Sequence, residues 1–292
     1  MLEFVSRISV VCFAASYAVA LACEASRLLF RSGIRGAVMV GFAAAGLVAH
    51  TAFLLWRAAS ESALPLSSPF DWYLLAAWLL AAGSLAMTVS APRTPVGLFI
   101  LPVVLGLIGA ATLSSREPFP QSPATQVWGA IHGSFNLAAS LAVAVGAVAG
   151  LMWLFQAGRL SRKKAPMRGF RMPSLERLSH TTAHAITLAA WTAAAGFSSG
   201  IVLNAVNRRR GLLETVPWTD PVVLRMTALV TWLVIAAVVA RTARRRPGGA
   251  RTMAWLSLAS FALLTGSILW GIFGTTQHGV PPTPRAVSEA AP

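Results

Sequence analysis

The sequence predicts an all-α, polytopic membrane protein, a helical bundle of about eight transmembrane spans. Of its 292 residues, 56% are hydrophobic and only 11% are charged, and the mean hydropathy is +0.66. Soluble domains carry roughly 25% charged residues. The apolar residues also gather in runs of about 20, which is the length of helix that crosses ~30 Å of hydrocarbon. Lipid excludes open strands, because their backbone groups would go unpaired, so these runs predict helices.

Eight apolar runs follow one another along the chain, and each predicts one membrane span. They cover residues 4–23, 35–56, 72–90, 96–113, 128–156, 181–206, 222–240 and 253–273. The first run is longer than the roughly 7–15-residue core of a signal peptide and follows no strong basic segment, so we expect it to be a helix of the mature protein. Together the spans predict a single transmembrane domain over residues 1–280 and a short flexible tail over residues 281–292.

The net charge of +15 is distributed by side of the membrane, which argues against nucleic acid as a partner. Alternate loops hold 16 of the 24 basic residues, with only Glu24 and Glu176 among them. The 16 are Arg27, Arg31, Arg35, Arg93, Arg159, Arg162, Lys163, Lys164, Arg168, Arg171, Arg177, Arg241, Arg244, Arg245, Arg246 and Arg251. By the positive-inside rule these loops are cytoplasmic and serve chiefly as topology signals, so both termini are expected to be extracytoplasmic.

Histidines in or beside the spans are candidates for function, because ionisable groups in lipid are costly. His132 is predicted about one turn inside the outer end of the fifth span, one turn after Trp128, and His278 follows the eighth span on the same side. Either can be a solvated interfacial residue, and together they can hold a flat, metal-bearing ligand. His50, in the second span, is interpreted as a buried hydrogen-bonding residue or as a third metal ligand.

Two further pairs are interpreted as structural. His180 and His184 are four residues apart, which places both on one helix face at the inner end of the sixth span. That spacing can bind a metal, but no third ligand is visible, so interfacial anchoring is the better interpretation. Cys12 and Cys23 lie on one helix about 16 Å apart and cannot form a disulfide.

The outer loop before the seventh span combines an aromatic residue with basic neighbours. It reads Glu214-Thr-Val-Pro-Trp218-Thr-Asp220-Pro221. Arg208-Arg209-Arg210 precedes this loop and Arg225 follows it, which makes the outer side locally basic. Basic residues on this side oppose the positive-inside rule, so we interpret them as a site for an anionic carboxylate.

Four segments carry a family resemblance. They are Pro65-Leu-Ser-Ser68-Pro-Phe70-Asp71-Trp-Tyr73 running on to Trp78, Trp128-x-x-x-His132-x-Ser134 with Gly146, Leu175-Glu-Arg-Leu-Ser179 with Gly196-x-x-Ser199-Gly200, and Thr231-Trp232-Leu-Val with Gly274-x-x-x-His278. In this order they resemble the cytochrome c assembly family, the membrane haem-handling proteins of the CcsA and HemX type. The likeness covers about residues 65–279.

Two departures from the family pattern favour its HemX-like side. The family's tryptophan-rich haem loop is reduced here to Trp218-Thr-Asp220-Pro221, whose Asp-Pro also falls out of register when counted back from Trp232. Ala240 stands where the CcsA branch places a membrane haem histidine. The export route of that branch is therefore expected to be incomplete in this chain.

The resemblance implies a membrane haem-handling component of cytochrome c biogenesis, with haem b as a transient ligand or substrate. His132 and His278 are implied as axial ligands of the haem iron at the outer face. The other residues implied at the haem are Trp128, Trp218, Asp220, Arg208, Arg209 and Arg210. The chain itself would catalyse little covalent bond formation. It would act with a CcsB-like or other maturation subunit and an apocytochrome c in a bacterial inner membrane.

Two alternatives stay open. A HemX-like membrane protein that regulates or scaffolds a haem-pathway complex would carry vestigial histidines and would fit the reduced tryptophan loop. A small-molecule transporter would need ionisable or broken-helix features near the middle of the membrane. The sequence places no Asp, Glu, Lys or Arg centrally in any predicted span, which disfavours the transporter.

Overall fold

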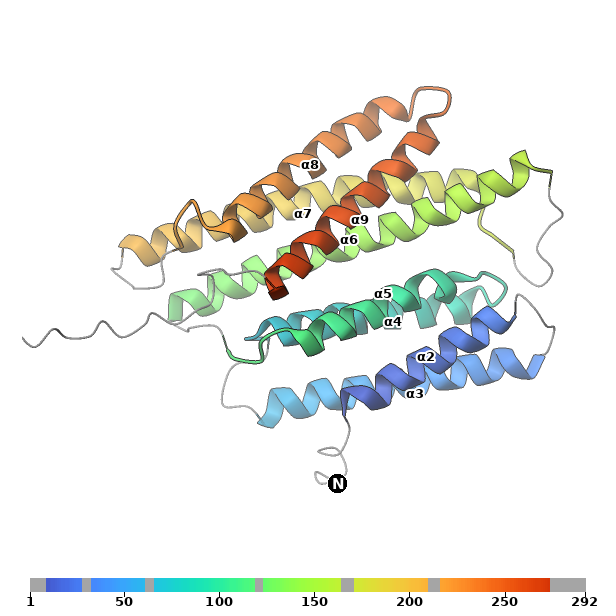
Figure 1. The fold of residues 1–292 in the computed structure, drawn as a ribbon, viewed down its shortest axis with the longest axis horizontal. Coiled ribbons are helices and arrows are strands. Elements are labelled where there is room, and N and C mark those ends of the chain that lie inside the picture. The colour runs from blue at the N-terminus through green and yellow to red at the C-terminus, as the bar shows by residue number, and fades with distance from the viewer. Residues whose placement is uncertain are drawn as a thin grey trace, which may run out of the picture.

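The computed structural model describes residues 9–27, 33–60, 66–118, 123–163, 171–209 and 216–273. Within these ranges the regular structure consists of eight helices and includes no strand. The helices are α2 (Val10–Ser26), α3 (Gly33–Ser60), α4 (Pro69–Ser90), α5 (Val96–Leu113), α6 (Pro123–Ser161), α7 (Leu175–Arg209), α8 (Pro221–Ala243) and α9 (Gly249–Phe273), as shown in Figure 1. Helices α3 to α9 are long and apolar enough to cross a membrane, whereas α2, with 17 residues, is shorter. The predicted all-α membrane fold is confirmed.

Several helices continue well past the apolar runs that predicted them. Helix α6 has 39 residues, or about 58 Å at 1.5 Å per residue, and begins five residues before the predicted span. His132 therefore lies about two and a half turns from the start of α6, but only about one turn from Val127, where the apolar part of the helix begins, as the sequence predicted. The two counts differ because hydropathy marks only the part of a helix that lies in lipid, while backbone hydrogen bonding continues into water.

The first four helices form one bundle, in which α2 packs on α3 and α5, and α4 packs on the same two helices. Its centre is filled by aromatic and aliphatic side chains such as Phe13, Tyr17, Phe70 and Leu74, each at most 1% exposed. In Figure 1 this bundle is the blue to teal half of the molecule.

The last four helices form a second bundle around the long α6–α7 pair, with α8 and α9 packed against it. The contact between α6 and α7 is lined by small residues, including Ala142, Ala189 and Ala193. A methyl group added at Gly146 would come within 3.1 Å of the Cβ atom of Ala185, so the two backbones approach closely. Small residues allow such approach where lipid supplies no hydrophobic force between helices.

Contacts of α6 with α4 and α5, and of α5 with α9, join the two bundles. Three of the loops predicted to share the inner side do meet at one end of the molecule. Arg27 donates a hydrogen bond to the Pro92 carbonyl over 2.8 Å, and the Arg171 amide donates to the Arg93 carbonyl over 2.8 Å. The beginning of α2 and the end of α9 both point toward the opposite end, on the left in Figure 1.

Candidate functional site

His132 is held between α6 and α7 by hydrogen bonds to both ring nitrogens. Its Nδ1 lies 2.7 Å from the Gly196 carbonyl oxygen, and its Nε2 lies 3.0 Å from Nδ2 of Asn136. A carbonyl can only accept and an amide NH₂ can only donate, so the pattern places the proton on Nδ1 and leaves Nε2 as an acceptor. The Ser199 hydroxyl donates to the same Gly196 carbonyl over 2.7 Å. The imidazole is thus oriented by two elements of the second bundle.

Two glycines of α7 make room for this ring. A methyl group at Gly200 would lie 2.8 Å from Cε1 and 3.0 Å from Nδ1 of His132. A methyl group at Gly196 would lie 2.9 Å from Oδ1 of Asn136. The Gly-x-x-Ser-Gly segment noted in the sequence is therefore the surface of α7 that receives the His132 side chain. Sequence reasoning missed Asn136, although its place one helical turn after His132 is a usable signal.

Replacing Gly200 with alanine should displace the His132 ring and destabilise the protein by about 1–3 kcal/mol, the usual cost of overpacking. The matched control is Gly129→Ala in α6, where nothing lies within 4 Å of the added methyl group. Thermal unfolding in detergent, together with ¹⁵N chemical shifts of the histidine rings, measures both effects. Unchanged His132 resonances in Gly200→Ala would show that the ring does not depend on this contact.

Aromatic side chains of α4 lie at the seam between the two bundles, close to His132. Trp72 of α4 packs directly on Gly133, leaving no space for a Cβ atom there. Tyr73, the next residue, lies within electrostatic reach of Arg225 on α8. Helix α4 therefore contributes aromatic side chains next to this part of α6, and Arg225 of α8 lies near Tyr73.

Arg225 is turned toward α9. Its Nε donates to the Pro221 carbonyl over 2.9 Å, and one terminal nitrogen donates to the Ser267 carbonyl over 3.2 Å. Its guanidinium carbon also lies 6.0 Å from the centroid of the Trp270 ring. This half-buried cation is held by backbone oxygens, which leaves its charge available to an anion.

The reduced tryptophan loop has clear structural contacts. The side chain of Asn204 on α7 forms two hydrogen bonds with the backbone of Val216. Its Nδ2 donates to the Val216 carbonyl oxygen and its Oδ1 accepts from the Val216 amide, each over 3.0 Å. Trp218 is 48% exposed. The buried Asp220 caps α8 by accepting from the Val222 amide over 2.8 Å, the usual role of aspartate at that position.

The remaining candidates do not contact His132 in the described residues. Arg208 and Arg209 are exposed on α7, about 12 Å along the helix axis from Gly200. Arg210 and His278 lie outside the described residues.

Trp128, also a candidate, is half-buried on α6, one turn before His132. Its place at the membrane surface, which the sequence predicted, stays a prediction.

His50 lies in the other bundle and is completely buried. Its ring stacks on Phe13 with centroids 4.1 Å apart, and its Nδ1 lies 3.4 Å from the Tyr17 hydroxyl. Its Nε2 has no hydrogen-bond partner. Helix α3 does not contact α6, and the described residues include no group of three or more His, Cys, Asp or Glu side chains able to hold a metal. His50 therefore does not join His132 in one site.

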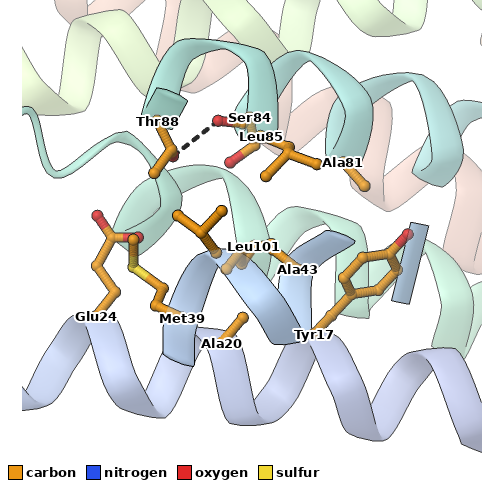
Figure 2. Close-up of a pocket in the computed structure, with 11 residues that line it drawn as sticks. Tyr17, Ala20, Glu24, Met39, Ala43, Ala81, Ser84, Leu85, Thr88 and Leu101 are labelled. Atoms are coloured by element: carbon orange, nitrogen blue, oxygen red, sulfur yellow. Dashed lines mark hydrogen bonds between the residues drawn. The ribbon is translucent and has the colours of Figure 1, made fainter. Parts of the chain in front are cut away.

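A small cavity runs along the axis of the first bundle, from Tyr17 toward Glu24 (Figure 2). Its empty space is about 300 Å³ including its open side. The Glu24 carboxyl group is buried, points toward Thr88 in this view, and packs on Gly97 at the start of α5. The cavity belongs to the first bundle and is separate from the His132 site.

No family model, curated protein or solved structure matches this chain. The described residues define an integral membrane protein of two four-helix bundles, with a histidine fixed by hydrogen bonds inside the second bundle. The first bundle meets this region through Trp72 and Tyr73 of α4.

Proposed function

We propose that this protein handles haem at the outer end of its second bundle, as a component of cytochrome c biogenesis in a bacterial inner membrane. The observation that carries the proposal is the hydrogen bond from His132 Nδ1 to the Gly196 carbonyl oxygen. Histidines that bind metals almost always donate their other ring N–H to a carbonyl, a carboxylate or water, which fixes the tautomer and the ring orientation. The resemblance of the surrounding segments to the cytochrome c assembly family supports the same assignment.

Binding of haem iron by His132 would require one local change. Nε2 of His132 is the nitrogen that would ligate iron, and it now accepts from Asn136. Because Asn136 lies on the same helix one turn away, rotation of its side chain frees Nε2 without moving the backbone. Haem, when bound, would supply an iron that accepts imidazole ligands. His278 is proposed as the second ligand.

Arg225 and Trp270 are proposed as further contacts for haem. Arg225 offers a cation for a propionate, because its present partners are neutral carbonyls. Trp270 lies beneath that guanidinium and is 58% exposed. Arg208 and Arg209 lie about 12 Å along the α7 axis from Gly200, the glycine that contacts the His132 ring.

The proposed orientation places the His132 site on the extracytoplasmic side. The support is the set of basic loops that meet at the other end of the molecule, held together by the bonds of Arg27 to Pro92 and of Arg171 to Arg93. Lys and Arg are enriched in cytoplasmic loops. Labelling of single cysteines introduced at Arg208 and at Arg245 in intact cells tests this orientation.

The direct test is the absorption spectrum of purified protein. We expect a Soret band in the wild type after haem titration, and we expect His132→Ala or His278→Ala to reduce haem affinity at least tenfold. His184→Ala is the matched control, because His184 is an exposed histidine near the opposite end of α7. Absence of a Soret band in the wild type, or an identical titration in His132→Ala, would refute haem handling at this site.

One observation favours a second candidate, a HemX-like protein that regulates or scaffolds a haem-pathway complex. Both ring nitrogens of His132 already have partners within the chain, so the imidazole can serve purely as a link between α6 and α7. Asn136→Ala distinguishes the two. It should strengthen haem binding if Nε2 is a ligand, whereas a scaffold would co-purify haem-free with a haem-synthesis enzyme and show no Soret band with or without Asn136.

A further inference from the structure

Five arginines crowd the hairpin that joins α8 to α9, and no carboxylate of the described residues forms an ion pair with them. Arg241, Arg244, Arg245, Arg246 and Arg251 are all exposed. None of them forms an ion pair within the described part of the chain. The sequence has no Asp or Glu between Asp220 and Glu289. Like charges this close repel one another, so a counter-anion would stabilise the hairpin.

Backbone hydrogen bonds hold these arginines in a tight turn. The Arg246 amide donates to the Ala243 carbonyl over 2.9 Å, and the Gly249 amide donates to the Arg246 carbonyl over 3.1 Å. Gly248 has a φ angle of +77°, which favours glycine. The exposed guanidinium groups therefore project from an ordered backbone, which lowers the entropy lost when they bind a ligand.

Both helices place apolar surface directly beneath the arginines. On α8, Val238 and Val234 follow Arg241 inward on the same face and are 57% and 44% exposed. On α9, Trp255 lies one turn below Arg251 and is 57% exposed. This order matches a phospholipid, because the arginines would meet its phosphate and the apolar surface beneath them would meet its acyl chains.

We propose that the α8–α9 hairpin binds the phosphate groups of anionic phospholipids. The location selects lipid, because α8 and α9 are apolar up to the hairpin and so place it at the depth of the headgroups. The residue type selects phosphate, because the planar guanidinium presents paired N–H groups that match phosphate oxygens, which lysine cannot do. This site lies at the opposite end of the second bundle from His132 and does not depend on the proposed haem function.

The test is a titration of the full-length protein in non-ionic detergent with phosphatidylglycerol, read by intact-complex mass spectrometry. Phosphatidylcholine with the same acyl chains and inorganic phosphate are the two comparison ligands. Each arginine near an anionic surface contributes roughly fivefold to binding. We expect Arg244→Gln, Arg245→Gln and Arg246→Gln combined to weaken phosphatidylglycerol binding at least tenfold, and Arg208→Gln with Arg209→Gln to leave it unchanged.

A second variant controls for the possibility that the neutralised hairpin inserts into the membrane in the wrong orientation. Arg244→Lys, Arg245→Lys and Arg246→Lys combined keep the charge that orients the helices and remove the paired donors, so binding should fall severalfold while topology is preserved. Equal retention of phosphatidylcholine, equal binding by the lysine and wild-type proteins, or an equivalent effect of inorganic phosphate would each overturn the proposal.

Discussion

Replacing Asp71 with alanine should lower the free energy of unfolding by about 3–5 kcal/mol, the usual cost of removing one partner of a buried ion pair. Asp71 forms an ion pair with Nε of Arg57, and the two side chains are only 7% and 12% exposed. The Ser68 hydroxyl also donates to Oδ2 of Asp71 over 2.7 Å. Without the carboxylate, the Arg57 charge stays buried without its counter-ion.

Denaturant titration in mixed micelles measures this effect, and two variants control it. Glu117→Ala removes an exposed carboxylate and should change stability by less than about 0.5 kcal/mol. Arg57→Met with Asp71→Leu removes both charges and should recover most of the loss, because apolar replacement of a whole buried pair is often neutral. A loss in the double variant as large as in Asp71→Ala would contradict this account.

Asp71 lies in the first of the four segments that resemble the cytochrome c assembly family. Asp71 follows Phe70, which has the guanidinium carbons of Arg57 and Arg116 each 4.8 Å from its ring centroid. Ser68 caps α4 by accepting from the Asp71 amide. These contacts tie α3, α4 and the segment after α5 together at the end of the first bundle where α4 begins, so the segment has a structural role whether or not haem binds nearby.

Replacing Gly249 with alanine should destabilise the protein by about 3 kcal/mol, at the upper end of the usual range for overpacking. The added methyl group would overlap the carbonyl oxygen of Ala243, a backbone atom that cannot rotate away. The α8–α9 hairpin would have to open, and the bond between the Gly249 amide and the Arg246 carbonyl would break.

Gly266→Ala is the matched control, because it lies in the same helix and nothing lies within 4 Å of the added methyl group. Alanine there should leave stability unchanged or raise it by up to about 1 kcal/mol. Denaturant titration of both variants gives the comparison, and equal stabilities would show that the hairpin tolerates a side chain at residue 249.

The helices themselves followed from composition. Each of the eight apolar runs corresponds to one helix, because a long apolar segment in lipid has to pair its backbone groups internally. The lengths of α6 and α7 did not follow, because their ends carry polar residues that hydropathy assigns to loops. The grouping into two bundles also lay beyond the sequence, since a lipid-facing stripe and a bundle-facing stripe are both apolar.

For the candidate site, too, the sequence predicted one part and the tertiary structure was needed for the rest. The sequence by itself determined that His132 is an uncommon polar residue in an apolar helix, which is why it could be singled out. Only the tertiary structure decided that its ring meets Gly196 and Asn136, that Arg225 turns toward Trp270, and that Asp220 caps a helix. Membrane insertion depends on summed hydrophobicity, which can be counted along a chain, whereas hydrogen bonds depend on atoms placed within about 3 Å by packing between distant segments.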